Sequence, residues 1–403
     1  MYKKKNHLFL TDSIVPLSTL SNKPTNLYNM LFSKKHMMMG ISFSIFLLTS
    51  CSKVEDEQAI QTTVKENISN ESKVKLKFLD EYIYPLNENF KNLPIGGLSG
   101  IDYDFENDLY YIVSDDPNNP RYYTANIDIK NNKINKPIFT DMFVFDKKAP
   151  FYSSTFLDLE SILYLNNQII ISSEGNIYGH QKPSIFSSDK KGNFLSEFTV
   201  PNIFLQETRN NGSFESLTKS FDKQGIWSAN ELPLKTDGSE PDFPQTNSPV
   251  RFTYYDQNTR QATKEFIYEL SALTQPRING NDMNGVSDIL EYKKDHFLVI
   301  ERAFQNENIV KIFDASITTN STNPFGTKSL KSEKYIPMKK ELVLDFNDIK
   351  KFLKQTKIDN IEGITFGKNL PNGNRTIIVI SDDNFQQFGP QLNQFILFEL
   401  IEK

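Results

Sequence analysis

A two-strand pattern recurs five times between Val74 and the end of the chain. Each copy opens with a short apolar strand that carries a small or acidic pair, and a second apolar strand then returns. The openings are Leu98-Ser99-Gly100-Ile101, Leu159-Glu160-Ser161-Ile162, Phe214-Glu215-Ser216-Leu217, Val286-Ser287-Asp288-Ile289 and Ile361-Glu362-Gly363-Ile364. Internal repetition of this kind is the signature of a repeat architecture, so it restricts the fold more than any other feature of the sequence.

The second residues of these openings are separated by 61, 55, 72 and 75 residues. This is longer than a usual propeller repeat, but it accommodates a four-stranded unit with long loops. Two further strands can be placed in the units, for example RYYTANIDI with KPIFTDMFVF, and RFTYYD with KEFIYEL. We therefore predict an all-β fold, a β-propeller with five countable four-stranded blades. A sixth blade in 232–285 or 303–360 is left open, and 347–355 reads as a short helical insertion.

The last unit lacks a fourth strand, whereas residues 73–85 form a strand with no partner in its own unit. Pairing these two segments would close the ring with strands from both ends of the chain. Closure removes the exposed sheet edges that otherwise promote aggregation.

Acidic residues recur where the returning strands end. These endings are Asp115-Asp116, Glu174, Glu231, Glu301-Arg302 and Asp382-Asp383. In an antiparallel blade the second strand returns to the level at which the first began, so these acids should meet the opening glutamates Glu160, Glu215 and Glu362 at one rim.

So many neighbouring carboxylates would raise one another's pKa unless a cation neutralises them. Oxygen ligands without Cys or His suit calcium or magnesium, and flexible carboxylate geometry favours calcium. The predicted metal ligands are Asp115, Glu160, Glu174, Glu215, Glu231, Glu301, Glu362 and Asp382. For any single acid at a strand end, hydrogen bonding to turn amides is the alternative. That alternative does not account for glutamates that open the first strand.

Other catalytic groups are scarce. Cys51 is the only cysteine, which excludes an intrachain disulfide and a cysteine-ligated zinc site in the folded part. Only His180 and His296 lie beyond residue 50, and no G-x-S-x-G motif occurs. A histidine cluster is therefore excluded, and both histidines are expected to have ordinary structural roles.

The N-terminal region predicts export. Lys34 and Lys35 precede an apolar run that is too short to span a bilayer, and Leu48-Thr49-Ser50-Cys51 looks like a bacterial lipobox. We predict a signal region over 1–50, with the true start possible at Met30. A lipidated Cys51 and a flexible tether then occupy 51–73, and a single domain occupies 74–403. Because Ser52 follows the cysteine, the outer membrane is the expected location.

Removal of residues 1–50 takes six lysines and one aspartate from the chain, and leaves 39 basic against 49 acidic residues. A net charge of -10 repels a phosphate backbone, so nucleic acid is not expected as a partner.

The five motifs also resemble one known family. The strings GGLSGIDYD, LDLESILYL, GSFESLTKS, NGVSDILEY and DNIEGITFG, each with its returning strand, are similar to the family described as the esterase-like activity of phytase. The resemblance covers roughly residues 90–400. It implies an exported propeller, often lipid-anchored in bacteria, with phosphoesterase or esterase activity. Catalytic residues of true propeller phytases do not transfer, because that likeness is architectural.

Two functions remain open. In the first, the protein is a calcium-dependent hydrolase of a small phosphorylated or ester substrate. Glu160, Glu215 and Glu362 would be metal ligands or a base, and Arg302 an anion clamp or a structural ion pair. Weaker anion-binding candidates are Arg121, Arg209 and Arg251. In the second, the protein is a non-catalytic surface propeller with structural calcium that binds a protein or glycan. The Pro-rich insertion 232–249 would be a lid in the first case and a binding loop in the second.

Overall fold

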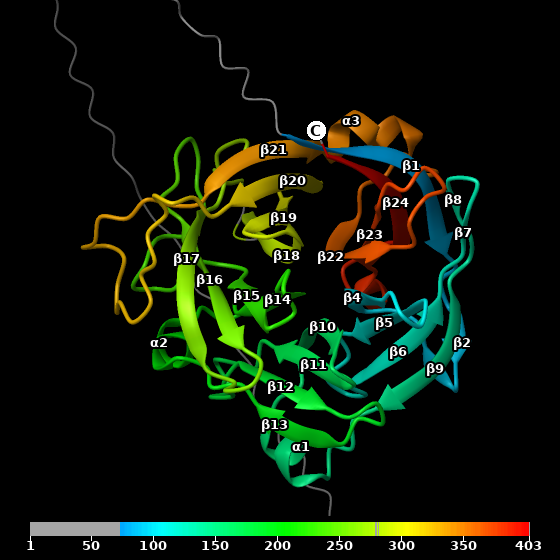
Figure 1. Ribbon diagram of the computed structural model, residues 1–403, viewed down its shortest axis with the longest axis horizontal. Helices are drawn as coiled ribbons and strands as arrows, with labels where there is room; N and C mark the ends of the chain where they lie inside the picture. Colours follow the sequence, from blue (N-terminus) through cyan, green and yellow to red (C-terminus); the bar gives the residue numbers. More distant parts are fainter. Residues whose placement is uncertain (1–72, 279, 281, 403) are drawn as a thin grey trace, which may run out of the picture. The chain divides into compact units, whose positions relative to one another are not determined.

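The computed structural model describes residues 73–402 except 279 and 281. The predicted signal region, Cys51 and the tether up to residue 72 lie outside these residues. The described residues form one compact unit. Within the described part, the long strands form five four-stranded antiparallel sheets arranged as the blades of a ring (Figure 1). The predicted five-bladed propeller is therefore confirmed, and neither long stretch between motifs forms a sixth blade.

Each blade is built from four strands, and its first strand lies nearest the ring axis. Blade 1 contains β4 (Leu98–Asp104), β5 (Leu109–Ser114), β6 (Arg121–Asn126) and β9 (Ile138–Val144). Blade 2 contains β10 (Leu159–Leu165), β11 (Gln168–Ser173), β12 (Ser184–Ser188) and β13 (Phe194–Glu197). Blade 3 contains β14 (Phe214–Lys219), β15 (Gly225–Asn230), β16 (Pro249–Asp256) and β17 (Ala262–Glu269). Blade 4 contains β18 (Met283–Lys293), β19 (His296–Phe304), β20 (Asn308–Ser316) and β21 (Lys339–Asp345).

Blade 5 closes the ring with both ends of the described chain. It contains β22 (Asn360–Gly367), β23 (Thr376–Asp382), β24 (Asn393–Glu402) and, as its outermost strand, β1 (Val74–Tyr84). The β1–β24 pairing runs from Val74 opposite Glu402 to Tyr84 opposite Asn393. The predicted closure by the 73–85 segment is thus confirmed.

Short hairpins and helices lie in the loops between the long strands. They are the hairpins β2 (Asn89–Phe90) with β3 (Leu93–Pro94) and β7 (Ile129–Lys130) with β8 (Lys133–Ile134), and the helices α1 (Pro150–Ser154), α2 (Asn202–Glu207), α3 (Phe346–Ile349), η1 (Lys350–Phe352) and η2 (Asn384–Gln386). The segment α3–η1 confirms the predicted helical insertion. None of the helices in the described part is long and apolar enough to cross a bilayer.

Five apolar clusters form the core, one at each junction between neighbouring blades. The strand β23 shows how the sequence produces this arrangement. Ile377 and Val379 pack toward blade 4, whereas Ile378 and Ile380 pack toward blade 1. Because successive side chains of a strand point to opposite faces, a strand covered on both faces reads as an uninterrupted apolar run.

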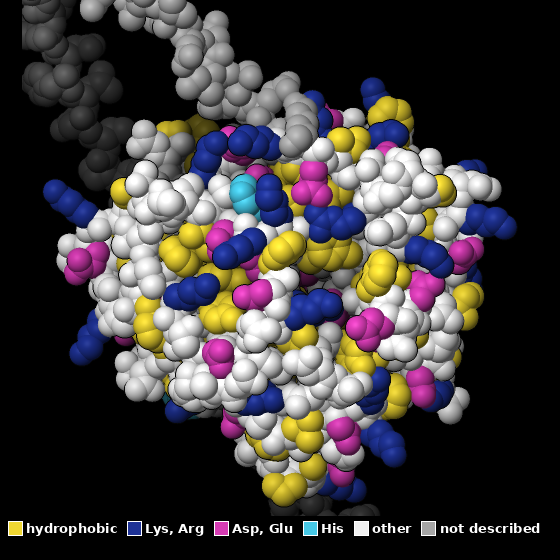
Figure 2. Space-filling model, viewed as in Figure 1, with side chains coloured by type: hydrophobic (Ala, Val, Ile, Leu, Met, Phe, Trp, Pro, Cys, Tyr) yellow, Lys and Arg dark blue, Asp and Glu magenta, His cyan; other side chains and the backbone are white. Residues whose placement is uncertain are grey.

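Charged groups of both signs lie on the surface. Figure 2 shows Lys and Arg side chains interspersed with acidic and apolar ones over one face of the ring. A much denser group of acids is largely buried close to the ring axis, where the innermost strands begin. We call this end of the axis the mouth.

Candidate metal centre at the mouth

A β-bulge occurs at the same place in all five innermost strands. The pairing of first and second strands skips one residue between Leu98 and Gly100, and equally in the other four blades. The skipped residues are Ser99, Glu160, Glu215, Ser287 and Glu362. A bulge re-aims the side chain of its extra residue. The repeated opening pair of the sequence is therefore the signature of this bulge.

In blade 1, the residue after the bulge is Gly100, and the backbone of blade 2 lies close to it. A Cβ atom on Gly100 would lie 2.6 Å from the carbonyl oxygen of Glu160 in blade 2. Glycine at this position therefore lets the innermost strands come together and brings the bulged glutamates of neighbouring blades close to one another.

The second strands place a further ring of five side chains at the mouth. The residue paired with the first residue of each opening motif is Ser114, Ser173, Asn230, Glu301 or Ser381. The residues that follow these are Asp115, Glu174, Glu231, Arg302 and Asp382. By register, Arg302 is thus the counterpart in blade 4 of an acid in every other blade.

The same register places Glu301, a predicted ligand, apart from the mouth acids. Its side chain accepts hydrogen bonds from Tyr268 Oη (2.6 Å) and Asn284 Nδ2 (3.0 Å), and it forms an ion pair with Lys340. Burial alone would raise the pKa of Glu301, but Lys340 and these hydrogen bonds outweigh burial and lower the pKa. Neighbouring residues of a strand face opposite sides, so an alignment that is off by one selects the wrong side chain.

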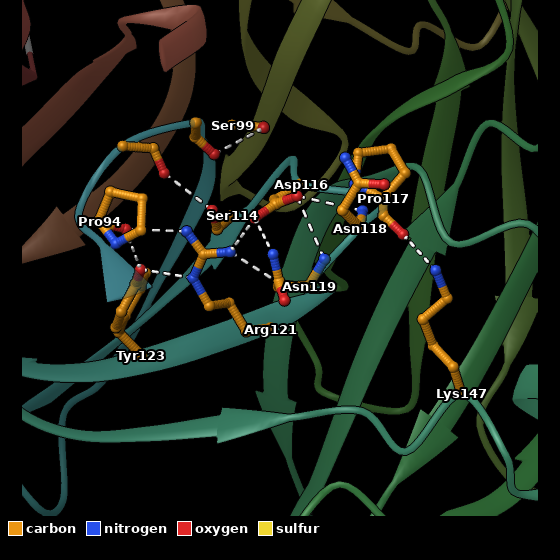
Figure 3. A network of polar contacts seen from close by, with 12 residues as sticks. Pro94, Ser99, Ser114, Asp116, Pro117, Asn118, Asn119, Arg121, Tyr123 and Lys147 are labelled. Carbon is orange, nitrogen blue, oxygen red and sulfur yellow. Dashed lines mark hydrogen bonds and ion pairs between the residues drawn. The ribbon is translucent and has the colours of Figure 1, made fainter. Parts of the chain in front are cut away.

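Asp116 and Asp383, the second acids of the two SDD motifs, also serve structural roles. Asp116 Oδ2 lies 2.6 Å from Arg121 Nη1 and accepts from Asn119 in the β5–β6 turn, as Figure 3 shows. Asp383 Oδ1 accepts from the backbone N–H of Gly97 at 3.0 Å. For these two acids the turn-chemistry alternative is correct.

Four of the remaining predicted ligands, together with Asp158, form two close groups. Carboxylate oxygens of Asp115, Asp158 and Glu160 lie within 4.8 Å of one another, and so do those of Glu160, Glu174 and Glu215. Blade 1 supplies Asp115 and blade 3 supplies Glu215. We use the term mouth cluster for Asp115, Asp158, Glu160, Glu174, Glu215, Glu231, Arg302, Glu362 and Asp382.

Burial and mutual repulsion disfavour the charged form of these acids. Desolvation, followed by the charges of Glu215 and Asp115, raises the pKa of Glu160 well above its ordinary value. Burial similarly raises the pKa of Glu174 to about 7 and that of Glu231 to about 8. The pKa values of Asp115, Asp158, Glu215, Glu362 and Asp382 are also raised, with desolvation as the largest cause.

Arg302 is the only basic residue of the mouth cluster, and it neutralises one side. Its Nη2 lies 3.1 Å from Glu231 Oε1, and its Nη1 lies 3.6 Å from Glu362 Oε1 and donates to Asn360. Both terminal nitrogens of the guanidinium are therefore engaged within the protein. These contacts support the structural ion-pair interpretation of Arg302 over the anion clamp.

The donor set of the mouth cluster fits a hard divalent cation. Glu231 is almost fully buried, and its Oε2 has no hydrogen-bond partner among the described residues. A buried carboxylate oxygen without a donor is costly, and a cation would compensate it. Carboxylates without Cys or His are the ligands that calcium prefers.

Sequence reasoning missed Asp158. It stands immediately before β10, two residues ahead of Glu160, and its carboxyl group contacts that of Asp115. The signal was present in the string LDLES, because residues two apart in an extended segment face the same side.

The other candidate side chains lie elsewhere. Arg251 pairs with Asp237 and Glu265, and Arg209 binds Glu240 and two backbone carbonyls. His296 Nδ1 lies 3.3 Å from Asp314.

His180 lines a cavity of about 410 Å³ together with Ser184 and Glu197. The Ser184 hydroxyl has no hydrogen-bond partner among the described residues. Ser154, which also lines the cavity, donates to the backbone carbonyl of Phe151 at 2.9 Å, so among the described residues neither serine hydroxyl is hydrogen-bonded to His180.

A family model described as phytase-like, esterase-like activity of phytase, matches residues 93–385. No curated protein matches the chain.

Several solved structures are similar at low identity. The endo-arabinase of Bacteroides thetaiotaomicron is 11% identical over 78% of this chain and 96% of its own, with a TM-score of 0.40. The GH43 endo-arabinanase of Bacillus licheniformis is 12% identical over 75% and 94%, with a TM-score of 0.35. The allergen Mala s 1 of Malassezia sympodialis is 10% identical over 79% and 82%, with a TM-score of 0.38. These similarities carry no argument about function.

The family match is different in kind, because it spans most of the chain and contains all five bulge motifs. The chain therefore belongs to the phytase-like family, whose description is esterase-like activity of phytase.

Proposed function

We propose that the protein is an exported, calcium-dependent hydrolase of small phosphorylated or ester substrates and that its active site is the mouth cluster. The observation that carries this proposal is the charge of the cluster. Eight largely buried carboxyl groups accompany a single guanidinium, and two groups of oxygens have the spacing of metal ligands. Bound calcium would supply charge neutralisation for an anionic substrate and would acidify a water molecule.

The residues of the mouth cluster would have three different roles. Asp115, Asp158, Glu160, Glu174 and Glu215 would hold the cation. Glu362 receives a hydrogen bond from Asn360 Nδ2 at 2.7 Å and faces Arg302, so it is the oriented carboxylate best placed to accept a proton. Arg302 would position Glu231 and Glu362.

Lipid attachment at Cys51 is a separate part of the proposal. It rests on the lipobox-like segment and the polar tract that follows it. Attachment there would place the propeller at the cell envelope, on the bacterial outer membrane.

The activity is tested by phosphate and carboxylate release from a panel of phosphomonoesters, phosphodiesters, phytate and carboxyl esters, with calcium or with EDTA. We expect calcium-dependent turnover that Glu215→Gln abolishes while the circular dichroism spectrum is unchanged. Glu106→Gln is the matched control, because Glu106 is an exposed acid in the β4–β5 turn. Turnover that survives EDTA or Glu215→Gln would refute this site.

One observation favours the non-catalytic alternative. Tyr178 is 84% exposed and Phe388 is 81% exposed, and both belong to loops that follow second strands, on the side of the mouth. Exposed aromatic side chains at such loops are typical of binding surfaces. A protein that binds calcium and gains thermal stability, but turns over none of the substrates, would support a binding propeller.

A further inference from the structure

We infer that the mouth holds two divalent cations, with the carboxylate of Glu160 shared between them. This inference rests on the proposed function, in which cations occupy the mouth cluster. It goes further because it assigns the number of ions and the ligands of each.

The first argument is geometric. The group Asp115, Asp158 and Glu160 bridges blades 1 and 2, and the group Glu160, Glu174 and Glu215 bridges blades 2 and 3. Glu160 belongs to both because it occupies the bulge of the blade in the middle. Asp115 contacts Asp158, and Glu174 contacts Glu215, so a close pair of carboxyl groups lies within each group. The five carboxylates offer ten oxygens, which is five for each ion when Glu160 gives one oxygen to each, and water molecules would complete the six to eight ligands that calcium takes.

The second argument is charge balance. The five carboxylates of the two groups carry a charge of -5 when ionised, and the side chains of Glu160, Glu174 and Glu215 are buried. One divalent ion would leave -3 in a region shielded from water, whereas two ions would leave -1. Buried carboxylates without a counterion are destabilising or take up protons, so the second ion is what allows all five groups to be ionised as ligands.

An independent observation points to a ligand beside the second group. The Oε2 atom of Glu231 is buried without a hydrogen-bond partner in the described part of the chain, and Glu231 lies near enough to Glu174 and Glu215 to interact electrostatically with both. A Cβ atom on Gly285 would lie 2.4 Å from Glu231 Cγ, so the backbone of blade 4 fixes this side chain. The hydroxyl of Ser213 is also buried with no partner among the residues that the structure describes, and the Ser213 N–H donates to Glu174 at 2.6 Å.

A third ion is not expected on the opposite side of the mouth. Arg302 already lies between Glu231 and Glu362, and Asp382 accepts a hydrogen bond from the Asn384 N–H at 2.8 Å. The guanidinium of Arg302, which blade 4 supplies, therefore neutralises Glu231 and Glu362 in place of a metal ion.

The test is a calcium titration of the full chain by isothermal calorimetry, with equilibrium dialysis as a second count of bound ions. We expect two calcium ions per chain for the wild type and for the control Glu106→Gln. Asp158→Asn should retain only the ion of the second group, and Glu174→Gln only the ion of the first. Glu160→Gln should weaken both by at least about tenfold, since it removes a shared ligand.

Several outcomes would overturn the inference. They are a single ion in the wild type, loss of all binding in both Asp158→Asn and Glu174→Gln, or a Glu160→Gln variant that loses one ion only. If a variant fails to fold, the wild-type count by dialysis still decides between one ion and two. Two bound ions without any hydrolysis would refute the proposed activity but support the shared site. Calcium-dependent hydrolysis with a single bound ion would support the proposed activity but refute the shared site.

Discussion

Without cations, the propeller should become less stable as the pH rises from about 4.5 to about 8. The pKa of Glu174 is raised from 4.5 to about 7 and that of Glu231 to about 8, chiefly by burial. Between these limits the folded state holds protons that the unfolded chain has released. The free energy of unfolding falls with pH wherever the folded state binds more protons, so the stability present in acid is lost as the pH passes through these values.

The magnitude follows from the two shifts. One pKa unit corresponds to about 1.4 kcal/mol, so Glu174 alone accounts for about 3 kcal/mol and Glu231 alone for about 5 kcal/mol. The two carboxyl groups interact, so their contributions do not add. We expect Glu174 and Glu231 together to account for a loss of about 5 kcal/mol, which corresponds to a fall of roughly 10 °C in the melting temperature for a domain of this size.

The assay is thermal unfolding of the purified protein across this pH range, in EDTA and in excess calcium. Calcium should abolish most of the fall, because an ion bound only to the folded state stabilises it and replaces the protons. In EDTA, the melting temperature of the Glu174→Gln variant should fall less steeply with pH than that of the wild type. A melting temperature in EDTA that is flat or rises toward pH 8 would show that these carboxyl groups are not held protonated by their surroundings.

Three further perturbations test separate parts of the structure. Above about pH 8, where Glu231 is ionised, Arg302→Met should lower stability by about 3 kcal/mol, because it leaves Glu231 and Glu362 without their counterion. Chemical denaturation measures this, and an unchanged midpoint would contradict the ion pair. Gly285→Ala should displace Glu231 and lower stability by about 1–3 kcal/mol, since the new Cβ would lie 2.4 Å from Glu231 Cγ; wild-type melting and calcium affinity would show that Glu231 is not held there. Cys51→Ser should move the protein from the membrane to the soluble fraction with the melting temperature of the domain unchanged, and retention in membranes would argue against lipid attachment at this residue.

The sequence was sufficient for the fold because its repeats are local. Each opening motif contains the residue that the pairing skips and the residues on either side of it. The strand predicted over residues 73–85 had no partner in its own unit, and the last unit lacked a strand, so the two could be matched. The runs of β23, such as Ile377 to Ile380, also identify strands that are covered on both faces.

The site was predicted less completely, because it depends on pairing register. In the motif HFLVIER, the acid that matches the other strand endings is Glu301. The pairing of β18 with β19 instead places Arg302 at the position that Asp115 occupies in blade 1. Asp158 was overlooked because it precedes its strand. The pairing of Arg302 with Glu231 and Glu362 joins residues far apart in the sequence, and no local pattern encodes it.

The joint between β1 and β24 also constrains the order in which the molecule can assemble. During synthesis, β1 is the first strand of the domain to emerge, yet its partner Asn393–Glu402 is the last. Blades 1 to 4 can each pair from neighbouring segments, whereas blade 5 requires contacts across almost the whole chain, which form slowly. Until then β1 is an unpaired strand with apolar residues along one face, a state prone to aggregation. The alternation of Lys75 and Lys77 with Val74 and Leu76 places charges on its other face, which would discourage premature pairing while the rest of the ring is completed.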